Sequence, residues 1–419
     1  MTKTIRKFDD FALNTPLKKS LAQMQYTTPT PIQAQAIPLA LGGRDIMGSA
    51  QTGTGKTAAF AIPLVQHILD NQDSTALVLT PTRELGKQVM NVIHQMLKES
   101  NVNTAFLIGG ESMGKQINKL KRNPRIIVGT PGRINDHLQR KTLNLSRCDF
   151  LVLDETDRML DMGFSVQLDR IFKFMPQKRQ SLMFSATLPA NIEKMSQQYL
   201  NNPARIAVGS TQQPAKNIKQ SVIKLQDGEK YPELVQQLEQ REGSVIVFVK
   251  TKRGADRMAK RLDKDGFKAE PMHGDLKQNK RDRVIKNYRD SKFRVLVATD
   301  VAARGLDIPH IAHVVNYDLP QVAEDYIHRI GRTARAGAEG EAVCFLSPKD
   351  SRLWHAIELL MDPDKKSNSS NDNKGGKRKR PSRKRTGGKK NRWSSAKKKK
   401  QANFKSKAKS SAKKAKSAA

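Results

Sequence analysis

The string AQTGTGKT at residues 50–57 is the part of the sequence best suited to chemistry. A short strand-like run precedes it and the apolar stretch AAFAIPLVQHIL follows it, which is the context that a phosphate-binding loop requires. Gly53 and Gly55 would let backbone N–H groups turn inward around phosphates. Lys56 would neutralise the β- and γ-phosphates, and Thr57 would offer its hydroxyl to Mg²⁺. We therefore expect a nucleoside triphosphate site formed by Ala50, Gln51, Thr52, Gly53, Thr54, Gly55, Lys56 and Thr57.

A second candidate site lies at LVLDETDRMLDMGF, residues 151–164, where an apolar run ends in acidic residues. Asp154 is placed to hold magnesium, and Glu155 could orient and deprotonate a water that attacks a phosphate. The alternative is an acidic helix N-terminus, where carboxylates interact favourably with the helix dipole. Taken alone, the two interpretations are equally good. The phosphate-binding loop about one hundred residues upstream favours the hydrolytic one.

A third string, HRIGRTARAG at residues 328–337, contains Arg332 and Arg335. Two arginines three positions apart share one face if the segment is helical. From the second half of the chain they could reach the γ-phosphate as arginine fingers. The alternatives are a solvated basic face or an RNA contact.

Short apolar runs alternate with amphipathic stretches, which is the pattern of βαβ units that build parallel sheets. We expect a first series of strands at 45–50, 76–80, 125–130, 150–155 and 181–186. We expect a second series at 244–249, 293–300, 313–318 and 341–346. Segment 201–220, rich in Pro, Gln and Asn, predicts a domain end and a linker. Because the polar strings follow strands, they should line the rim formed by the strands' carboxyl ends.

The charge of the chain is strongly positive and uneven. It has 76 Lys and Arg against 40 Asp and Glu, a net charge of +36. Residues 365–419 alone carry 23 basic residues and one acid, Asp372. Such a charge indicates a polyanionic partner, with nucleic acid the simplest choice. The last segment has too few apolar residues to fold alone, so we expect a disordered basic tail.

The sequence argues against a membrane partner, because no window approaches the roughly 20 apolar residues of a spanning helix. The start, MTKTIRKFDDFAL, lacks the apolar region of a signal peptide, so we expect a soluble, cytoplasmic protein. Cys148 and Cys344 lie in apolar runs and should be small buried hydrophobes. His273 and the apolar residues Met159, Met162 and Phe164 are expected to be structural.

Taken in order, the strings resemble the motifs of the DEAD-box ATP-dependent RNA helicases, over about residues 8–350. Besides the three sites above, the matching strings are YTTPTPIQ (26–33), PTREL (81–85), GG (109–110), TPGR (130–133), SAT (185–187), VFVKT (247–251), QNKR (278–281) and ATDVAARGLD (298–307). Two residues depart from the family pattern. Gln25 stands where Gly is frequent, and Thr156 makes the name motif DETD, which could alter its coupling to the SAT segment.

The resemblance implies roles for further residues. Gln33 and Phe8 would bind adenine, and Asp307 the ribose. Asp157, Ser185, Thr187 and His328 would couple hydrolysis to strand separation. The RNA backbone would be contacted by Pro81, Thr82, Arg83, Gly110, Thr130, Gly132, Arg133, Arg281, Thr299 and Arg304. Backbone contacts predict weak sequence preference, and 2′-OH contacts would select RNA over DNA.

The resemblance also implies two RecA-like domains and a cycle of ATP hydrolysis that locally unwinds or remodels RNA. The expected division is a Q-motif region at 1–37, an ATP-binding domain at 38–208, a linker at 209–219, a helicase C-terminal domain at 220–361 and an RNA-binding tail at 362–419. Ribosome assembly and RNA turnover are the usual roles of such proteins, and the chain looks most like the RhlE/SrmB-type branch. An RNA chaperone acting through its tail and a DNA helicase are the rival functions.

Overall fold

The computed structural model describes residues 7–50, 53–186, 190–208, 217–303, 308, 310–334 and 338–362. The side chains of residues 190 and 191 are excluded from the description. Several predicted site residues lie outside the described residues: Gln51, Thr52, Thr187, Arg304, Asp307, Arg335 and the tail from residue 363.

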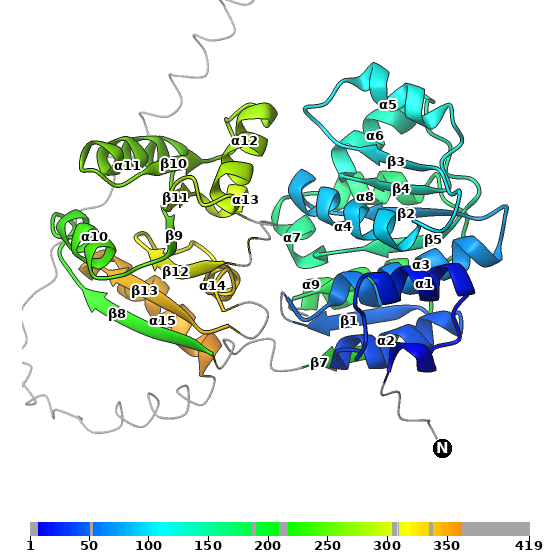
Figure 1. Cartoon of the computed structure of the whole chain (residues 1–419), viewed down its shortest axis with the longest axis horizontal. Coiled ribbons are helices and arrows are strands. Elements are labelled where there is room, and N and C mark those ends of the chain that lie inside the picture. The colour runs from blue at the N-terminus through cyan, green and yellow to red at the C-terminus, as the bar shows by residue number, and fades with distance from the viewer. Residues whose placement is uncertain are drawn as a thin grey trace, which may run out of the picture. The chain divides into compact units, whose positions relative to one another are not determined.

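Two parallel sheets organise the chain (Figure 1), and both belong to one compact unit. We call residues 7–208 the first lobe and residues 217–362 the second lobe. The first sheet has the strand order β3-β4-β2-β5-β6-β1-β7. Its strands are β1 (Ile46–Ala50), β2 (Thr75–Leu79), β3 (Thr104–Leu107), β4 (Ile126–Gly129), β5 (Cys148–Leu153), β6 (Gln180–Ser185) and β7 (Ala204–Val208).

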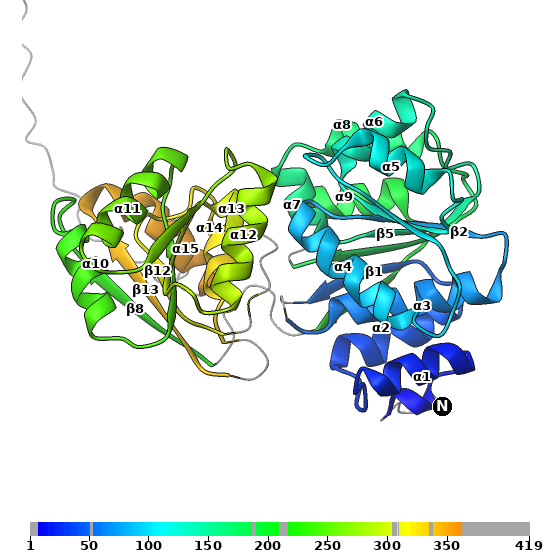
Figure 2. The same cartoon turned by 45° about the horizontal axis from the view of Figure 1, so that its top comes forward.

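Helices cover both faces of the first sheet (Figure 2), because its central strands are apolar on both sides. Phe60, Val89 and Ile37 belong to the core on one face, and Ile134, Met159 and Ile192 belong to the core on the other. The helices are η1 (Phe8–Asp10), α1 (Thr15–Gln23), α2 (Pro31–Leu41), α3 (Lys56–Asp70), α4 (Arg83–Met96), α5 (Met113–Leu120), α6 (Pro131–Gln139), α7 (Thr156–Asp161), α8 (Ser165–Phe172) and α9 (Ala190–Tyr199).

The second lobe repeats this architecture with the strand order β10-β11-β9-β12-β13-β8. Its strands are β8 (Ile218–Lys224), β9 (Ser244–Phe248), β10 (Ala269–Met272), β11 (Val295–Ala298), β12 (Ile311–Asn316) and β13 (Gly340–Leu346). Its helices are α10 (Lys230–Glu239), α11 (Lys252–Lys264), α12 (Gln278–Arg289), α13 (Asp300–Ala303), α14 (Ala323–Ile330), η3 (Pro348–Asp350) and α15 (Ser351–Met361). The expected class, two parallel sheets flanked by helices, is confirmed.

The structure adds strands that the sequence patterns missed. β3, β8 and β10 are partly exposed strands near sheet edges, so their apolar patterns are weak. β7 lies inside 201–220, the segment read as a domain end and linker, and pairs in parallel with β1. β7 closes the first lobe at Val208, and β8 begins the second lobe at Ile218. The alternation of Arg205, Ile206 and Ala207 on a half-exposed strand was hidden by the surrounding Pro and Gln residues.

The strand order divides the rim of the first sheet into two halves. The loops after β1, β6 and β5 carry AQTGTGKT, SAT and DETD, and these three strands are direct neighbours. The loops after β2, β4 and β3 carry PTREL, TPGR and GG, and these strands are neighbours too. The sheet thus separates the candidate nucleotide residues from the candidate RNA residues, with β5 and β2 joining the two halves. Among the described residues, no helix is long and apolar enough to cross a membrane.

Candidate functional site

The phosphate-binding string forms a loop between β1 and α3. Gly53 and Gly55 have φ of 86° and 90°, the left-handed conformation that side chains disfavour. Gly55 is the N-cap of α3, so the positive end of that helix faces the loop. Lys56 is buried, and its Nζ donates to the carbonyl of Ala50 at 2.8 Å. The described part of the loop thus presents the features that the sequence predicted for phosphate.

Gln33 ties the YTTPTPIQ segment to this loop. Its Oε1 accepts from the backbone N–H of Thr30 at 2.9 Å, and its Nε2 donates to the carbonyl of Gly55 at 3.0 Å. A Cβ added at Gly55 would lie 2.3 Å from that Nε2. Phe8 is buried against Tyr26 with its backbone N–H bonded to Thr27. Phe8 therefore anchors the segment that carries Gln33.

The acidic string forms a strained turn between β5 and α7. Glu155 has φ of 52°, a conformation rare for a residue with a side chain. Asp154 accepts from the Glu155 N–H at 3.0 Å. Burial raises the pKa of Asp154 to about 7, the Glu155 charge adds to the rise, and Lys56 opposes it. The site therefore favours a cation beside Asp154.

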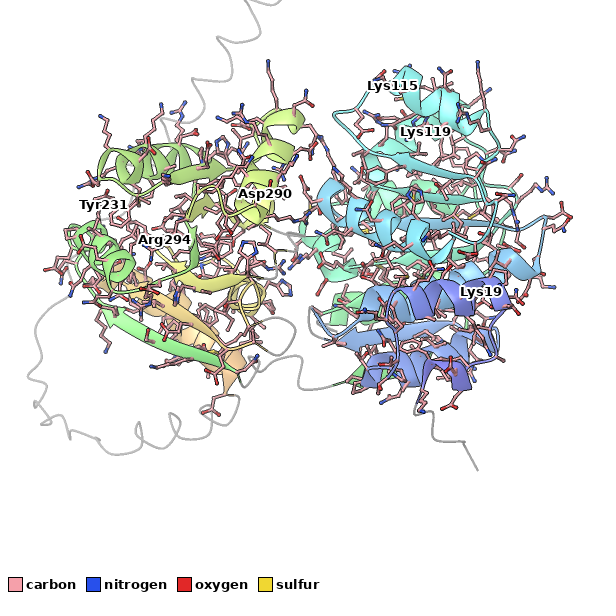
Figure 3. The ribbon with its side chains drawn as sticks, in the orientation of Figure 1. Lys19, Lys115, Lys119, Tyr231, Asp290 and Arg294 are labelled. Carbon is pink, nitrogen blue, oxygen red and sulfur yellow. The ribbon has the colours of Figure 1, made fainter. Side chains whose placement is uncertain are left out.

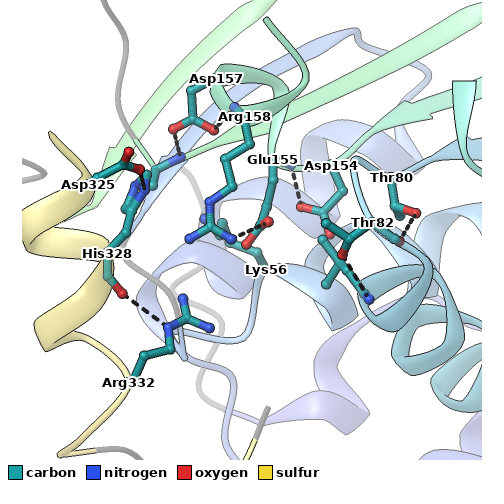
Figure 4. Close-up of polar contacts among 12 residues, drawn as sticks. Lys56, Thr80, Thr82, Asp154, Glu155, Asp157, Arg158, Asp325, His328 and Arg332 are labelled. Atoms are coloured by element: carbon teal, nitrogen blue, oxygen red, sulfur yellow. Dashed lines mark hydrogen bonds and ion pairs between the residues drawn. The ribbon is translucent and has the colours of Figure 1, made fainter. Parts of the chain in front are cut away.

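Glu155 is buried and forms an ion pair with Arg158, one turn along α7, at 2.6 Å. Burial alone would raise the pKa of Glu155, but the charges of Arg158, Lys56 and Arg332 outweigh it and hold that pKa below its ordinary value. Figure 4 shows these side chains together. Glu155 is thus kept ionised, as an acceptor of a water proton must be. The sequence analysis missed Arg158, although its spacing from Glu155 on a helix was a usable signal.

Asp157 connects the acidic turn to the SAT segment and to the second lobe. Its Oδ2 accepts from the backbone N–H of Ala186 at 3.1 Å. Burial would raise the pKa of Asp157, but His328, Lys56 and Arg158 lower it. Ser185 is buried, and its hydroxyl also lowers this pKa. The structure thus gathers Asp157, Ser185 and His328, the described residues of the predicted coupling group. Figure 4 shows Asp157 and His328 side by side.

The arginine string is described only in part, because Arg335 lies outside the described residues. α14 ends at Ile330, so Arg332 follows the helix. Arg332 is buried, and its Nε donates to the carbonyl of His328 at 3.0 Å. Gly331 is the C-cap that ends α14. Arg332 nevertheless contributes to the low pKa of Glu155.

Arg329 is a further residue that the sequence analysis did not single out. Its guanidinium forms a two-pronged ion pair with Asp300, at 2.5 and 2.8 Å, and donates to Asn316 at 3.0 Å. It therefore fixes α14 to the ATD segment. Its place beside His328 in HRIGRTAR was the available signal.

Thr156, the departure from the family's name motif, is fully buried. Its hydroxyl lies 3.4 Å from the carbonyl of Leu153 and 3.3 Å from the carbonyl of Phe184, the residue before Ser185. The hydroxyl thus links the acidic turn to the end of β6. This contact lies beside the link made by Asp157 to Ala186.

We expect Thr156→Ala to keep ATP hydrolysis within about threefold of wild type, because Asp154, Glu155 and Asp157 are untouched. Loss of the hydroxyl should lower the free energy of unfolding by about 1 kcal/mol. Steady-state hydrolysis and denaturant unfolding check both values. Thr156→Ser, which keeps the hydroxyl, is the matched control. A tenfold loss of hydrolysis in Thr156→Ala alone would instead show that the hydroxyl takes part in the reaction cycle.

The predicted RNA contacts meet in one cavity of about 820 Å³. Among its lining residues are Pro81, Thr82, Arg83, Gly110, Thr130, Gly132, Arg133 and Arg281. Thr299 is buried and is not among them. Met159 is in the core, and Phe164 packs against it, as the packing expectation has it. Met162 and Phe164, which follow α7, also line the cavity.

Two pairs across this cavity join the lobes. Arg83 donates to the side-chain oxygen of Gln278 at 2.7 Å. Arg281 forms an ion pair with Glu84 at 2.8 Å. Gly110, with φ of 80°, lies against the Arg83 guanidinium, which a Cβ would approach to 2.2 Å. Glu84 and Gln278 lie within the matched PTREL and QNKR strings but were not singled out.

The remaining singled-out residues are structural. His273 is buried, with its Nε2 3.0 Å from an oxygen of Asp256. Cys148 and Cys344 are buried and unpaired, as expected. Burial raises the pKa of both thiols to about 12, so neither is a thiolate at neutral pH.

Oxygen donors for Mg²⁺ are present but few. Within the described ranges, no three His, Cys, Asp or Glu side chains form a cluster that could hold a metal ion. Asp154 is a buried carboxylate whose pKa is raised, chiefly by that burial. One carboxylate and the Thr57 hydroxyl fit a magnesium ion that takes its other ligands from phosphate oxygens and water.

A phosphate-binding loop after β1, an acidic turn after β5 in the same sheet, and basic residues supplied by a second sheet define a two-lobed P-loop nucleoside triphosphatase. The model of the DEAD/DEAH box helicase family matches residues 30–195, and that of the helicase conserved C-terminal domain matches residues 229–337. The chain belongs to the DEAD-box helicase family.

Individual relatives agree with this assignment. ATP-dependent RNA helicase CshA of Listeria monocytogenes is 44% identical over 355 residues, covering 84% of this chain and 68% of the relative. DEAD-box ATP-dependent RNA helicase CshA of Bacillus subtilis is 43% identical over 353 residues, covering 84% and 72%. Among solved structures, S. cerevisiae Dbp5 bound to RNA and ADP BeF3 matches with a TM-score of 0.79 and 33% identity, covering 85% of this chain and 94% of that one. The lobes are therefore RecA-like.

Proposed function

We propose that the chain is an ATP-dependent RNA helicase that hydrolyses ATP to ADP and phosphate and locally unwinds or remodels RNA. The observation that carries the proposal is that Arg332 and His328 of the second lobe line one small cavity with Arg158 of the first, beside Glu155 and Asp157, whose pKa values they lower (Figure 4). A catalytic carboxylate whose charge depends on both lobes ties hydrolysis to their closure. ATP and RNA, each binding both lobes, then favour the same state and bind cooperatively.

In this proposal the residues of the first lobe bind ATP and activate water. The loop amides from Gly53 to Lys56 hold the phosphates, Gln33 reads the base, and Lys56 balances phosphate charge. Glu155 accepts the proton of the attacking water, and Arg332 stabilises charge on the transferred phosphoryl group. Arg335 and Asp307 keep their proposed roles as second arginine finger and ribose ligand.

We propose that Mg²⁺ is held by Thr57 and Asp154, partly through water. When bound, the ion would neutralise phosphate charge as it develops. The residues around it do the positioning. Asp154 is fixed by the Glu155 N–H, and Lys56 keeps a second positive charge beside the carboxylates.

RNA is proposed to occupy the cavity lined by Arg83, Arg133 and Arg281. The solved structures that match include the DEAD-box helicase Mss116 bound to ssRNA and UDP-BeF, with a TM-score of 0.77 and 28% identity. Gly109, Gly110 and Gly132 line the cavity and have no side chains. An RNA phosphate backbone can therefore approach their main-chain N–H groups. A cavity of this kind contacts the RNA backbone rather than the edges of the bases.

The test is ATP hydrolysis by the purified protein with no nucleic acid, with single-stranded RNA, and with DNA of the same sequence. We expect RNA to stimulate hydrolysis at least about tenfold and DNA to do so far less, since 2′-OH contacts select RNA. Equal stimulation of ATP hydrolysis by DNA would favour a DNA helicase over an RNA helicase. Hydrolysis indifferent to both would contradict the clamp mechanism.

We further propose that the tail, residues 362–419, keeps RNA close to the lobes through phosphate contacts. Deleting it should leave the maximal hydrolysis rate within about twofold but raise the RNA concentration needed for half-maximal stimulation. The dependence of RNA affinity on salt should become shallower, because fewer counterions are released. Titration of RNA at several salt concentrations measures both. If the deletion abolishes strand annealing and leaves unwinding unchanged, the RNA chaperone function gains support.

The domain limits of 38–208 and 220–361, a cytoplasmic location, and a role in ribosome assembly or RNA turnover remain parts of this proposal. The dominance of backbone contacts gives no RNA target by itself. The tail's charge of +22 at residues 365–419 suits any RNA-rich particle.

A further inference from the structure

Gln116 is a buried amide in the first lobe to which the reaction proposed above gives no role. It lies on α5 with 1% of its surface exposed. Lys115 and Lys119 on the same helix are exposed and project outward from the lobe (Figure 3). The Gln116 amide instead faces inward. Its Nε2 donates to the carbonyl of Ile108 at 2.8 Å, and its Oε1 lies 3.1 Å from Nε2 of His137 on α6.

His137 continues this chain of hydrogen bonds. It is fully buried, and its Nδ1 lies 2.8 Å from the hydroxyl of Thr142. The Gln116 oxygen can only accept, so Nε2 of His137 must carry a proton. Burial lowers the pKa of His137, and Arg133 adds to this effect, so the ring is neutral and its Nδ1 is bare. The Thr142 hydroxyl lies within hydrogen-bonding distance of both Nδ1 and the backbone carbonyl of His137, at 2.8 and 3.2 Å.

Hydrogen bonds therefore link Thr142, His137, Gln116 and the carbonyl of Ile108 in series. Buried bonds in series polarise and strengthen one another. A network in which each donor has its acceptor also permits one arrangement of α5 and α6 and excludes others. We call Thr142, His137 and Gln116 the Gln116 relay.

The relay ends at the edge of the RNA cavity. Ile108 directly precedes Gly109 and Gly110, which pack against the Arg83 guanidinium. His137 is on the helix whose first turn carries Gly132 and Arg133. A separate bond, from Arg133 to the carbonyl of Glu111 at 3.2 Å, joins the same two segments nearer the surface. The Gln116 relay thus connects, through buried hydrogen bonds, the Gly109–Gly110 turn and α6, both of which line the RNA cavity.

We infer that Gln116 and His137 are positioning residues for RNA: they fix the Gly109–Gly110 turn relative to the first turn of α6, so that both meet one RNA backbone. The inference rests on the proposed function. It also explains why a buried histidine and a buried glutamine stand where apolar residues would pack without the cost of burying polar groups.

The experiment compares the full-length chain with Gln116→Met, His137→Gln and Thr142→Val. Gln116→Met keeps the side-chain length and removes both bonds. His137→Gln retains a donor at the Nε2 position, and Thr142→Val removes only the end of the relay. ATP hydrolysis is measured against the concentration of a single-stranded RNA oligonucleotide, and thermal unfolding is followed in parallel.

Gln66→Met is the matched control, because it makes the same change at another buried glutamine of the first lobe. Gln66 bonds Asn14 and Asp70 on the α1 side of the lobe. Both glutamine variants should lose stability. Only Gln116→Met should raise the KM for RNA, by about 5- to 10-fold, with kcat at saturating RNA within about twofold and the KM for ATP without RNA unchanged. His137→Gln should give a smaller rise, and Thr142→Val the smallest.

If Gln116→Met and Gln66→Met have the same KM for RNA, the relay only stabilises the core and does not position the RNA cavity. That result would overturn the inference. If Gln116→Met does not fold, His137→Gln and Thr142→Val decide it: an unchanged KM for RNA in whichever variant folds overturns it as well. Failure of the proposed function looks different, since the wild-type protein itself would then show no stimulation by RNA.

Discussion

Glu155→Gln is expected to reduce RNA-stimulated ATP hydrolysis by at least about 100-fold, the scale of a general base in such reactions. Glutamine has nearly the same shape but cannot accept a proton from water. The structure shows a carboxylate whose pKa is held low by Arg158, Lys56 and Arg332 although it is buried. A change that keeps the shape and removes the charge therefore acts on the chemical step.

ATP binding should survive in Glu155→Gln, because the loop from Gly53 to Thr57 is untouched. Equilibrium binding of a fluorescent ATP analogue and single-turnover hydrolysis measure the two steps separately. Glu193→Gln, which alters a surface pair with Arg205 in the same lobe, is the matched control and should hydrolyse ATP normally. If Glu155→Gln keeps more than a tenth of wild-type hydrolysis, another group activates the water.

Gly55→Ala is expected to raise the KM for ATP at least about tenfold. At φ of 90° an alanine pays a conformational cost of roughly 1–2 kcal/mol. Its Cβ would also lie 2.3 Å from Nε2 and 3.1 Å from Cδ of Gln33, so the Gln33 side chain or the loop must move. Because the same contact joins the adenine-reading segment to the phosphate loop, both halves of the ATP site should be disturbed.

Alanine variants at two other glycines distinguish the effect of backbone strain from the effect of a steric clash with Gln33. Gly53 has φ of 86° and Gly266 has φ of 88°, and a Cβ at either position meets no atom within 4 Å. Gly53→Ala should weaken ATP binding less than Gly55→Ala, since it adds strain without displacing Gln33. Gly266→Ala, in the turn after α11, should cost stability alone. Equal KM values for ATP in Gly53→Ala and Gly55→Ala would show that contact with Gln33 contributes nothing.

The sequence could predict features that depend on neighbouring residues. The run DIMGSAQTGTGKT followed by an apolar helix specifies a phosphate-binding loop locally, and the structure places Gly53 and Gly55 in the backbone conformation that the string requires. The alternating apolar runs predicted two parallel sheets, which the structure confirms. The functional roles assigned to individual residues remain predictions.

Only the tertiary structure decided which distant residues meet, because pairing depends on strand order and on burial that spacing does not encode. The adjacency of β1, β6 and β5 brings Lys56 to Asp154. Sequence distance gave no sign that the Thr156 hydroxyl would reach Phe184, or that Gln116 would bond His137. The structure ends α14 at Ile330 and places Arg332 beyond that end, a boundary that the HRIGRTAR string by itself did not specify. The sequence by itself determined the local chemistry of each string, whereas long-range packing determined which charges and hydrogen bonds share one buried site.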